Sequence, residues 1–164
     1  MYLMMRKIFL LILLVISSNV FGDDFLPPEE AFKAVATWNI KKSVGQVNSV
    51  ADIEITVAPV AGYYIYRESL KLHVVNQPQN AKEVISINLP KGKIKFDENF
   101  GKKLEVYPSP FQIAATYGQA DLSRLTLEME LQGCADKGIC YPPMRMQFKF
   151  AAANQLIDGV VLDE

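Results

Sequence analysis

The sequence is poor in the residues from which most enzyme sites are built. It has one histidine, His73, and two cysteines, Cys134 and Cys140, among 164 residues. Zinc takes about four ligands, and two cysteines with one distant histidine do not supply a recognisable set. There is also no G-x-S-x-G elbow, no phosphate-binding glycine loop and no C-x-x-C motif. We therefore expect neither a cofactor nor a metal, and the cysteines are left as the candidate catalytic residues.

The sequence also lacks a basic cluster and a second long apolar run. Lysine and arginine number 17 against 18 acidic residues, a net charge of −1, so no electrostatic feature favours nucleic acid. The single apolar run, Ile8–Ile16, follows Arg6 and Lys7 and precedes small and polar residues. It is shorter than the roughly 20 residues of a spanning helix and has the features of a secretory signal peptide. Cleavage after Gly22 would give a soluble periplasmic protein; the alternative is an uncleaved membrane anchor.

The rest of the chain has the period-2 alternation of β-strands. Four segments alternate strongly between apolar and polar residues: 52–57, 70–74, 125–131 and 144–150. Four more fit loosely: 34–40, 84–89, 104–107 and 111–116. Proline, glycine, asparagine and aspartate punctuate the intervals, and only residues 28–33 suggest a helical turn. We predict an all-β, immunoglobulin-like antiparallel β-sandwich over residues 23–150, after a signal peptide at 1–22 and before a tail at 151–164 of ambiguous structure.

The two cysteines lie close together in sequence, between two of the strongly alternating segments. Six residue steps would span roughly 20 Å if extended, whereas paired cysteines have Cα atoms about 5.5 Å apart. The segment must fold back, and Asp136 and Gly138 are suitable turn residues. In an oxidising compartment we expect a disulfide. The spacing of the cysteines does not by itself establish a redox function for this disulfide, because most short-loop disulfides are structural. However, closing so short a loop stabilises by only roughly 2.4 kcal/mol, against about 4.7 for a 100-residue loop.

Three stretches resemble one known family. The sequence C-A-D-K-G-I-C-Y-P-P, from Cys134 to Pro143, closely resembles the active-site loop of the N-terminal periplasmic domain of DsbD, the membrane thiol:disulfide interchange reductase. G-Y-Y-I-Y-R at 62–67 is similar to a strand of that domain, and D-E-N-F-G-K at 97–102 is similar to its cap loop. The resemblance extends over most of the chain from about residue 25 to 150. It implies an immunoglobulin-like fold and thiol:disulfide oxidoreductase activity.

The resemblance also implies partners and residue roles. Electrons would come from a thioredoxin-like domain that is reduced through a membrane donor. They would pass to periplasmic disulfide isomerases or to thioredoxins of cytochrome c maturation, with no small-molecule substrate and a monomeric protein. Cys140 would form mixed disulfides with partners and Cys134 would resolve them. The residues expected around the pair are Tyr64, Tyr66, Asp97, Glu98, Asn99, Phe100 and Tyr141. Ordinary strand packing is the alternative role for the two tyrosines at 64 and 66.

Two departures from the family pattern affect these expectations. Asn99 occupies the cap position where the family has an aromatic ring, so we expect Phe100, one residue later, to shield the disulfide. The chain also ends at Glu164 without the family's membrane segment and C-x-x-C domain, which leaves open whether the relay is encoded separately. A nearby carboxylate raises a thiol pKa. We therefore expect Asp97 or Glu98 to keep the reduced pair unreactive until a partner docks.

Two other functions fit the same residues. One is a secreted β-sandwich that binds a protein partner and carries a purely structural disulfide. The other is a metal-binding domain, which would carry zinc or copper when reduced. A reduction potential separates the first from a relay, because structural disulfides lie below about −300 mV.

Overall fold

The fold is known from a computed structural model, in which the described residues are 25–41, 50–75, 85–118, 122, 125–150 and 156–162. The predicted signal peptide lies outside these ranges. Within them, no helix has the length and apolar character needed to cross a membrane. The described chain has one short helix, α2 (Pro28–Ala31), and one 3-10 turn, η1 (Arg67–Ser69). Its strands are β1 (Phe32–Lys41), β2 (Val50–Pro59), β3 (Tyr63–Tyr66), β4 (Lys71–Val74), β5 (Ile85–Asn88), β6 (Lys93–Asp97), β7 (Lys102–Tyr107), β8 (Phe111–Tyr117), β9 (Thr126–Leu131), β10 (Gly133–Ala135), β11 (Met144–Lys149), β12 (Leu156–Asp158) and β13 (Val160–Val161).

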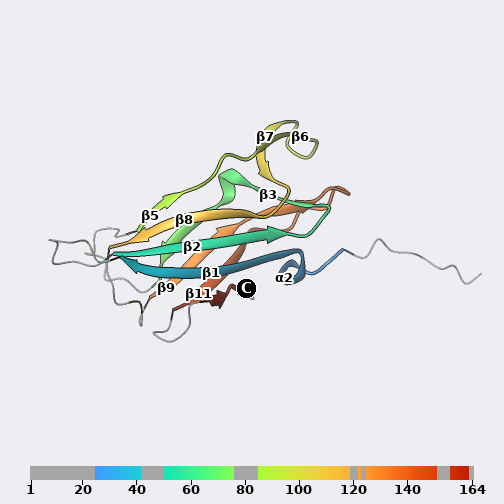
Figure 1. The fold of residues 1–164 in the computed structure, drawn as a ribbon. Coiled ribbons are helices and arrows are strands. Elements are labelled where there is room, and N and C mark those ends of the chain that lie inside the picture. Colours follow the sequence, from blue (N-terminus) through green and yellow to red (C-terminus); the bar gives the residue numbers. More distant parts are fainter. Residues whose placement is uncertain are drawn as a thin grey trace, which may run out of the picture.

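The first layer is a five-stranded antiparallel sheet in the order β12-β1-β2-β8-β5 (Figure 1). In β2, Ile53, Ile55 and Val57 are buried, whereas Glu54 between them is exposed. β-Branched residues suit such a half-buried pleated surface. The alternation thus gives this sheet one face in the core and one face towards solvent.

The second layer is the antiparallel sheet β13-β11-β9-β4, which packs against the first. Leu127 and Met129 of β9 and Met146 and Phe148 of β11 are fully buried, in the same core cluster as the isoleucines of β2. The predicted immunoglobulin-like β-sandwich is confirmed. The tail at 151–164, which the sequence left ambiguous, contributes β12 to the first layer and β13 to the second, and so connects the two layers.

A third sheet, with four strands in the order β10-β3-β7-β6, extends the second layer. Only Gln132 separates β9 from β10, and only η1 and Leu70 separate β3 from β4, so both strand pairs run on from the sandwich. The hairpin of β6 and β7 stands off one end of the molecule in Figure 1. We call residues 93–107, which comprise β6, β7 and their turn, the cap hairpin.

All eight predicted segments contain strands, and the predicted helical turn is α2. The period-2 pattern did not predict β3, β6 or β10. All four residues of β3 are buried, so it shows no alternation, and β10 has only three residues. In β6 the pattern is inverted, because Ile94 and Phe96 are exposed while Asp97 is buried.

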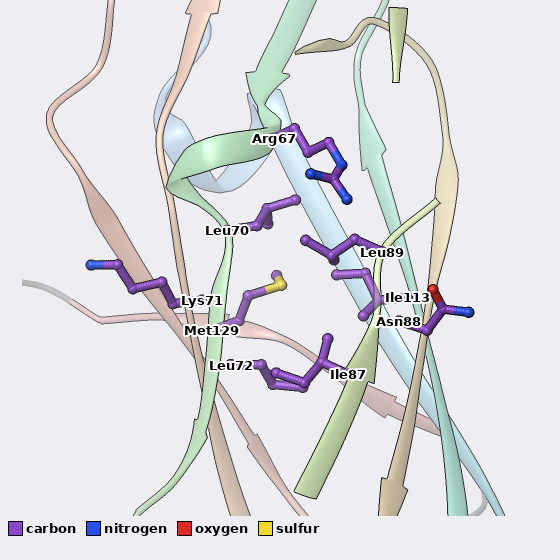
Figure 2. Close-up of a pocket in the computed structure, with 9 residues that line it drawn as sticks. All are labelled: Arg67, Leu70, Lys71, Leu72, Ile87, Asn88, Leu89, Ile113 and Met129. Carbon is purple, nitrogen blue, oxygen red and sulfur yellow. The ribbon is translucent and has the colours of Figure 1, made fainter. Parts of the chain in front are cut away.

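A cavity of about 310 Å³ lies between β4 and β5, where the two layers part (Figure 2). Aliphatic side chains, including Leu70, Leu89 and Ile113, surround it, and the Arg67 guanidinium lies at one end. Arg67 is held there by the Pro90 carbonyl, 3.3 Å from its Nε, and by Glu105, 3.6 Å away. No cysteine lines this cavity, so it is separate from the site described next.

Candidate functional site

The two cysteines face each other across a tight hairpin, residues 134–140, which we call the cysteine hairpin. They form a disulfide with the sulfurs 2.06 Å and the Cα atoms 4.0 Å apart, as predicted. The Ala135 N–H donates to the Ile139 carbonyl at 2.7 Å, and the Gly138 N–H donates to the Ala135 carbonyl at 3.0 Å. Gly138 has a φ of 97°, which is the left-handed region that favours glycine. The predicted turn chemistry therefore produces the fold-back that brings the sulfurs together.

The two sulfurs differ in accessibility. Cys134 lies in β10 and is 0% exposed, whereas Cys140 is half-buried at the end of the hairpin. A partner that approaches from solvent can therefore reach Cys140 first.

The cysteine hairpin is fastened to the sandwich at its base. The Asp136 N–H donates to the Gly62 carbonyl at 2.8 Å, and the Tyr141 N–H donates to the Gly133 carbonyl at 3.0 Å. Gly133 packs so closely that a Cβ there would lie 2.5 Å from the Phe32 ring and 2.7 Å from the Tyr64 carbonyl oxygen. The absence of a side chain at this position allows β10 to lie against β3 and the core.

β3 directs two tyrosines towards the sulfurs. Tyr63 and Ile65 belong to the main core, whereas Tyr64 and Tyr66 point to the opposite side into a second cluster that includes Cys134. The Tyr66 hydroxyl oxygen lies 3.0 Å from Cys134 Sγ and 3.7 Å from Cys140 Sγ. The rings of Tyr64 and Tyr66 pack edge to face, with centroids 5.5 Å apart. Although all four residues of β3 are buried, successive side chains point to opposite sides of the strand. Tyr64 and Tyr66 therefore lie on the same side as the disulfide.

Asp97, at the end of β6, is the buried acceptor of this cluster. Its side chain is 2% exposed, and Oδ2 accepts hydrogen bonds from the hydroxyls of Tyr64 at 2.9 Å and Tyr66 at 2.6 Å. Oδ1 accepts from the backbone N–H groups of Asn99 at 2.9 Å and Phe100 at 3.1 Å. Asp97 is therefore linked to the disulfide through the Tyr66 hydroxyl.

The hydrogen bonds shift the pKa values in this cluster. Burial by itself raises the pKa of Asp97, but the hydrogen bonds from Tyr66, Tyr64 and the two backbone groups outweigh it and lower that pKa below its usual value. Burial, followed by the hydrogen bond to Asp97, raises the pKa of Tyr66 far above 10. Burial is also the largest cause of the raised pKa of Tyr64. The cluster thus holds an ionised carboxylate between two neutral phenols.

The turn of the cap hairpin covers Cys140. The Asn99 side-chain amide donates from Nδ2 to Cys140 Sγ at 3.3 Å. Phe100 packs edge to face on the Tyr66 ring at 5.5 Å and is 52% exposed. Glu98 is exposed, and within the described chain its carboxylate forms no hydrogen bond or ion pair. Within the turn, Asn99 therefore donates a hydrogen bond to the Cys140 sulfur, and Phe100 packs on the Tyr66 ring beside it.

Tyr141 packs away from the sulfurs. Its ring lies edge to face on Phe32 at 5.4 Å, and its hydroxyl donates to the Leu26 carbonyl at 2.5 Å. Burial, followed by the neighbouring Tyr63, raises the pKa of Tyr141 to about 12. Tyr141 thus ties the start of the domain to the base of the cysteine hairpin.

The sequence analysis missed Lys95, and it considered Asp136 only as a turn residue. Lys95 Nζ lies 3.9 Å from the centroid of the Tyr64 ring and forms an ion pair with Asp136. The signal was the two-residue spacing of Lys95 and Asp97, which places both on the same face of a strand. In the described ranges, no three His, Cys, Asp or Glu side chains form a group that could hold a metal ion.

Comparison with known proteins shows which protein family the chain matches. The family model described as "Thiol:disulfide interchange protein DsbD, N-terminal" matches residues 22–152. The thiol:disulfide interchange protein DsbD of Ralstonia nicotianae is 37% identical over 132 residues, which are 80% of this chain and 20% of the relative. DsbD of Escherichia coli K12 is 32% identical over 148 residues, 85% of this chain and 23% of the relative. The chain thus spans about a fifth of the length of these curated relatives.

Solved structures agree with the sequence comparison. The reduced N-terminal domain of Neisseria meningitidis DsbD superimposes with a TM-score of 0.64 at 26% identity, covering 87% of this chain and all of that one. A second structure from the same organism is a complex between the DsbD N-terminal and PilB N-terminal domains. It matches with a TM-score of 0.57 at 27% identity, covering 81% of this chain and 91% of that one.

Proposed function

Because the chain belongs to the family of DsbD N-terminal domains, we propose that it is a periplasmic thiol:disulfide exchange module that relays electron pairs through Cys134 and Cys140. The observation that carries this proposal is the pairing of a half-buried Cys140 with a fully buried Cys134 beside the Tyr66–Asp97 hydrogen bond. A disulfide used only as a staple needs neither a reachable sulfur nor a buried carboxylate behind it.

The relay step is a pair of exchanges. In the reduced protein, the Cys140 thiolate attacks a sulfur of the partner's disulfide, forms a mixed disulfide and expels one partner thiolate. The Cys134 thiolate then attacks Cys140 Sγ, breaks the mixed disulfide and releases the second partner thiolate. Two electrons pass to the partner, and the two protons lost by the cysteine thiols match the two taken up by the partner's thiols. A reduced upstream dithiol restores the pair by the same steps in reverse.

The Tyr66–Asp97 hydrogen bond supports a restraining role for Asp97. Tyr66 donates its proton to Asp97, and in the disulfide form its oxygen lies 3.0 Å from Cys134 Sγ, so on reduction it can accept a hydrogen bond from the Cys134 thiol. A hydrogen bond donated by the protonated form, together with the nearby negative charge, disfavours the thiolate. Asp97 would therefore keep the resting thiols protonated. Exposed Glu98 has no such connection within the described chain.

The proposed partners are proteins with a thioredoxin fold. The donor would be a thioredoxin-like domain reduced through a membrane protein, and the acceptors would be disulfide isomerases or cytochrome c maturation thioredoxins. The Neisseria complex with the PilB N-terminal domain supports a protein partner. We further propose that residues 1–22 are a cleaved signal peptide and that the domain, which starts at residue 23 and includes β12 and β13 of the tail, works as a monomer.

Trapping tests this function. In Cys134→Ala expressed in the periplasm, the mixed disulfide on Cys140 has no resolving thiol, so we expect thioredoxin-fold proteins to accumulate on Cys140. Cys140→Ala is the matched control, and it should trap little because Cys134 is buried. The relay also requires a reduction potential above the range of structural disulfides, which lies below about −300 mV. A lower potential together with an empty trap in folded protein would favour the binding-module alternative.

A further inference from the structure

Lys95 connects the two hairpins that meet at the disulfide. It lies on β6 in the cap hairpin, and its ammonium group forms an ion pair with Asp136 in the cysteine hairpin. The same group lies 3.9 Å from the centroid of the Tyr64 ring. Lys95 and Asp136 both line a cavity of about 160 Å³ that also touches Asn99. Lys95 of β6 therefore contacts both β3 and the cysteine hairpin.

The cap hairpin is anchored to β3 by strand pairing and by the hydrogen bonds that Asp97 accepts from Tyr64 and Tyr66, whereas the cysteine hairpin itself is contacted by the Asn99 amide and by Lys95. Asn99 Nδ2 lies 3.3 Å from Cys140 Sγ, so the space next to that sulfur is occupied. A thiolate that attacks Cys140 must come within bonding distance of Sγ, and the Asn99 amide must move to admit it. Movement of the cap hairpin away from the cysteine hairpin also separates Lys95 from Asp136.

We propose that Lys95 is a positioning residue, whose ion pair with Asp136 holds the cap hairpin closed over Cys140 and so sets how fast a thiol reaches the disulfide. The role rests on the proposed relay function only for its biological purpose, because access to Cys140 can be measured without a partner. The Lys95 and Asp136 side chains are 36% and 56% exposed. The pair is therefore weak enough to open when a partner docks, and salt should loosen it.

Reduction by dithiothreitol measures this access. A dithiothreitol thiolate attacks Cys140 Sγ and expels the Cys134 thiolate; the second dithiothreitol thiol then closes its own ring disulfide and releases Cys140. In Lys95→Met, which keeps the aliphatic stem and removes the charge, we expect this reduction to be roughly threefold to fivefold faster. That factor corresponds to about 0.7–1 kcal/mol on a rate, the size of a partly exposed ion pair. Asp136→Asn should give the same gain.

The double variant tests whether Lys95 and Asp136 act through one shared ion pair or have independent effects on the rate of reduction. If the two side chains act through one ion pair, Lys95→Met/Asp136→Asn should react no faster than either single variant. Raising the salt from about 0.01 M to about 1 M shortens the Debye length from about 30 Å to about 3 Å. The rate of the wild-type protein should then rise towards that of Lys95→Met, whose own rate should change little.

Lys93→Met is the matched control, because Lys93 lies two residues earlier on the same face of β6 and is exposed. It should react at the wild-type rate, and all variants should keep the wild-type melting temperature within a few degrees. Equal rates for Lys95→Met and Lys93→Met, or single-variant gains that multiply in the double variant, would overturn the positioning role. A reduction potential in the structural range, with these rate differences intact, would instead overturn the relay and leave the positioning of Lys95 standing.

Discussion

At the scale of single residues, Asp97 is the buried charged group at the centre of the site's hydrogen bonds. Four donors converge on its two oxygens, and these hydrogen bonds keep the carboxylate ionised although the side chain is 2% exposed. A charged carboxylate without such partners would be costly to bury. Tyr66, one of the two tyrosines that donate to Asp97, also lies 3.0 Å from Cys134 Sγ, so a change in the charge of Asp97 should affect the cysteine pair through Tyr66.

We predict that Asp97→Asn makes the reduced protein more reactive. Removal of the negative charge should lower the apparent pKa of the thiol pair and so speed alkylation at a fixed pH. The measurement is the pH dependence of alkylation by iodoacetamide, with the unfolding free energy checked in parallel. Glu98→Gln is the matched control, since it removes a charge one residue away that makes no hydrogen bond within the described chain. If Asp97→Asn is alkylated no faster than the wild type or than Glu98→Gln, the restraining role of Asp97 is wrong.

At the scale of elements, the site is formed where two short connections join strands of the sandwich to strands of the third sheet. β9 becomes β10 at Gln132, and β4 is reached from β3 through η1. The Tyr66 N–H donates to the Gln132 carbonyl at 3.0 Å, and the Gln132 side-chain amide donates to the Tyr141 carbonyl at 3.1 Å. The cysteine hairpin is therefore a direct extension of the core strand β9 and is hydrogen-bonded to it at Gln132.

We predict that Gly133→Ala destabilises the domain. The new methyl group would meet the Phe32 ring and the Tyr64 carbonyl oxygen at 2.5 Å and 2.7 Å. Overpacking of this kind costs about 1–3 kcal/mol of unfolding free energy, which chemical denaturation of the oxidised protein would measure. In a Phe32→Leu background the smaller side chain relieves part of the clash, so the added cost of Gly133→Ala should fall. An unchanged cost in that background would show that the Phe32 ring is not responsible.

At the scale of the whole molecule, the buried tyrosines couple folding to pH. Burial raises the pKa of Tyr64, Tyr66, Tyr107 and Tyr141 above the usual 10.0, so the folded chain keeps protons that the unfolded chain releases above that pH. Stability gained from these groups is complete below pH 10 and is lost as the pH rises towards their folded pKa values.

We therefore predict that the free energy of unfolding is level from about pH 8 to pH 9.5 and falls above pH 10. Each tyrosine that stays protonated contributes a slope of up to about 1.4 kcal/mol per pH unit. Denaturation of the oxidised protein between pH 8 and pH 11.5 checks this, and Tyr66→Phe should show a shallower fall. A free energy that stays flat to pH 11.5 would contradict the assignment.

The alternation of Ile53, Ile55 and Val57 with polar neighbours was enough to predict a half-buried strand, and seven other segments followed in the same way. This succeeded because solvent on one face and core on the other impose a period of two. It failed at β6, whose exposed Phe96 and buried Asp97 invert the usual preference. It also did not predict β12 and β13, because such short strands form only by pairing with strands that are distant in sequence.

For the site, the cysteine pair and its turn followed from residues close together in sequence, because ring closure over six residue steps is a local property of the chain. The choice between Asn99 and Phe100 as the residue over Cys140 could not be made in the same way. That choice depends on how the cap hairpin turns relative to β3, residues more than 30 positions away.

The sequence by itself determined that this is a β-sandwich with one pair of cysteines placed to form a disulfide, because strand periodicity and short-range turn chemistry depend on neighbouring residues. Tertiary structure decided which sulfur is accessible, which carboxylate is buried, and that Lys95 bridges the two hairpins. Those features arise where β3, β6 and β10 meet, and the energies of burial and charge pairing there depend on distances between residues that the sequence keeps far apart.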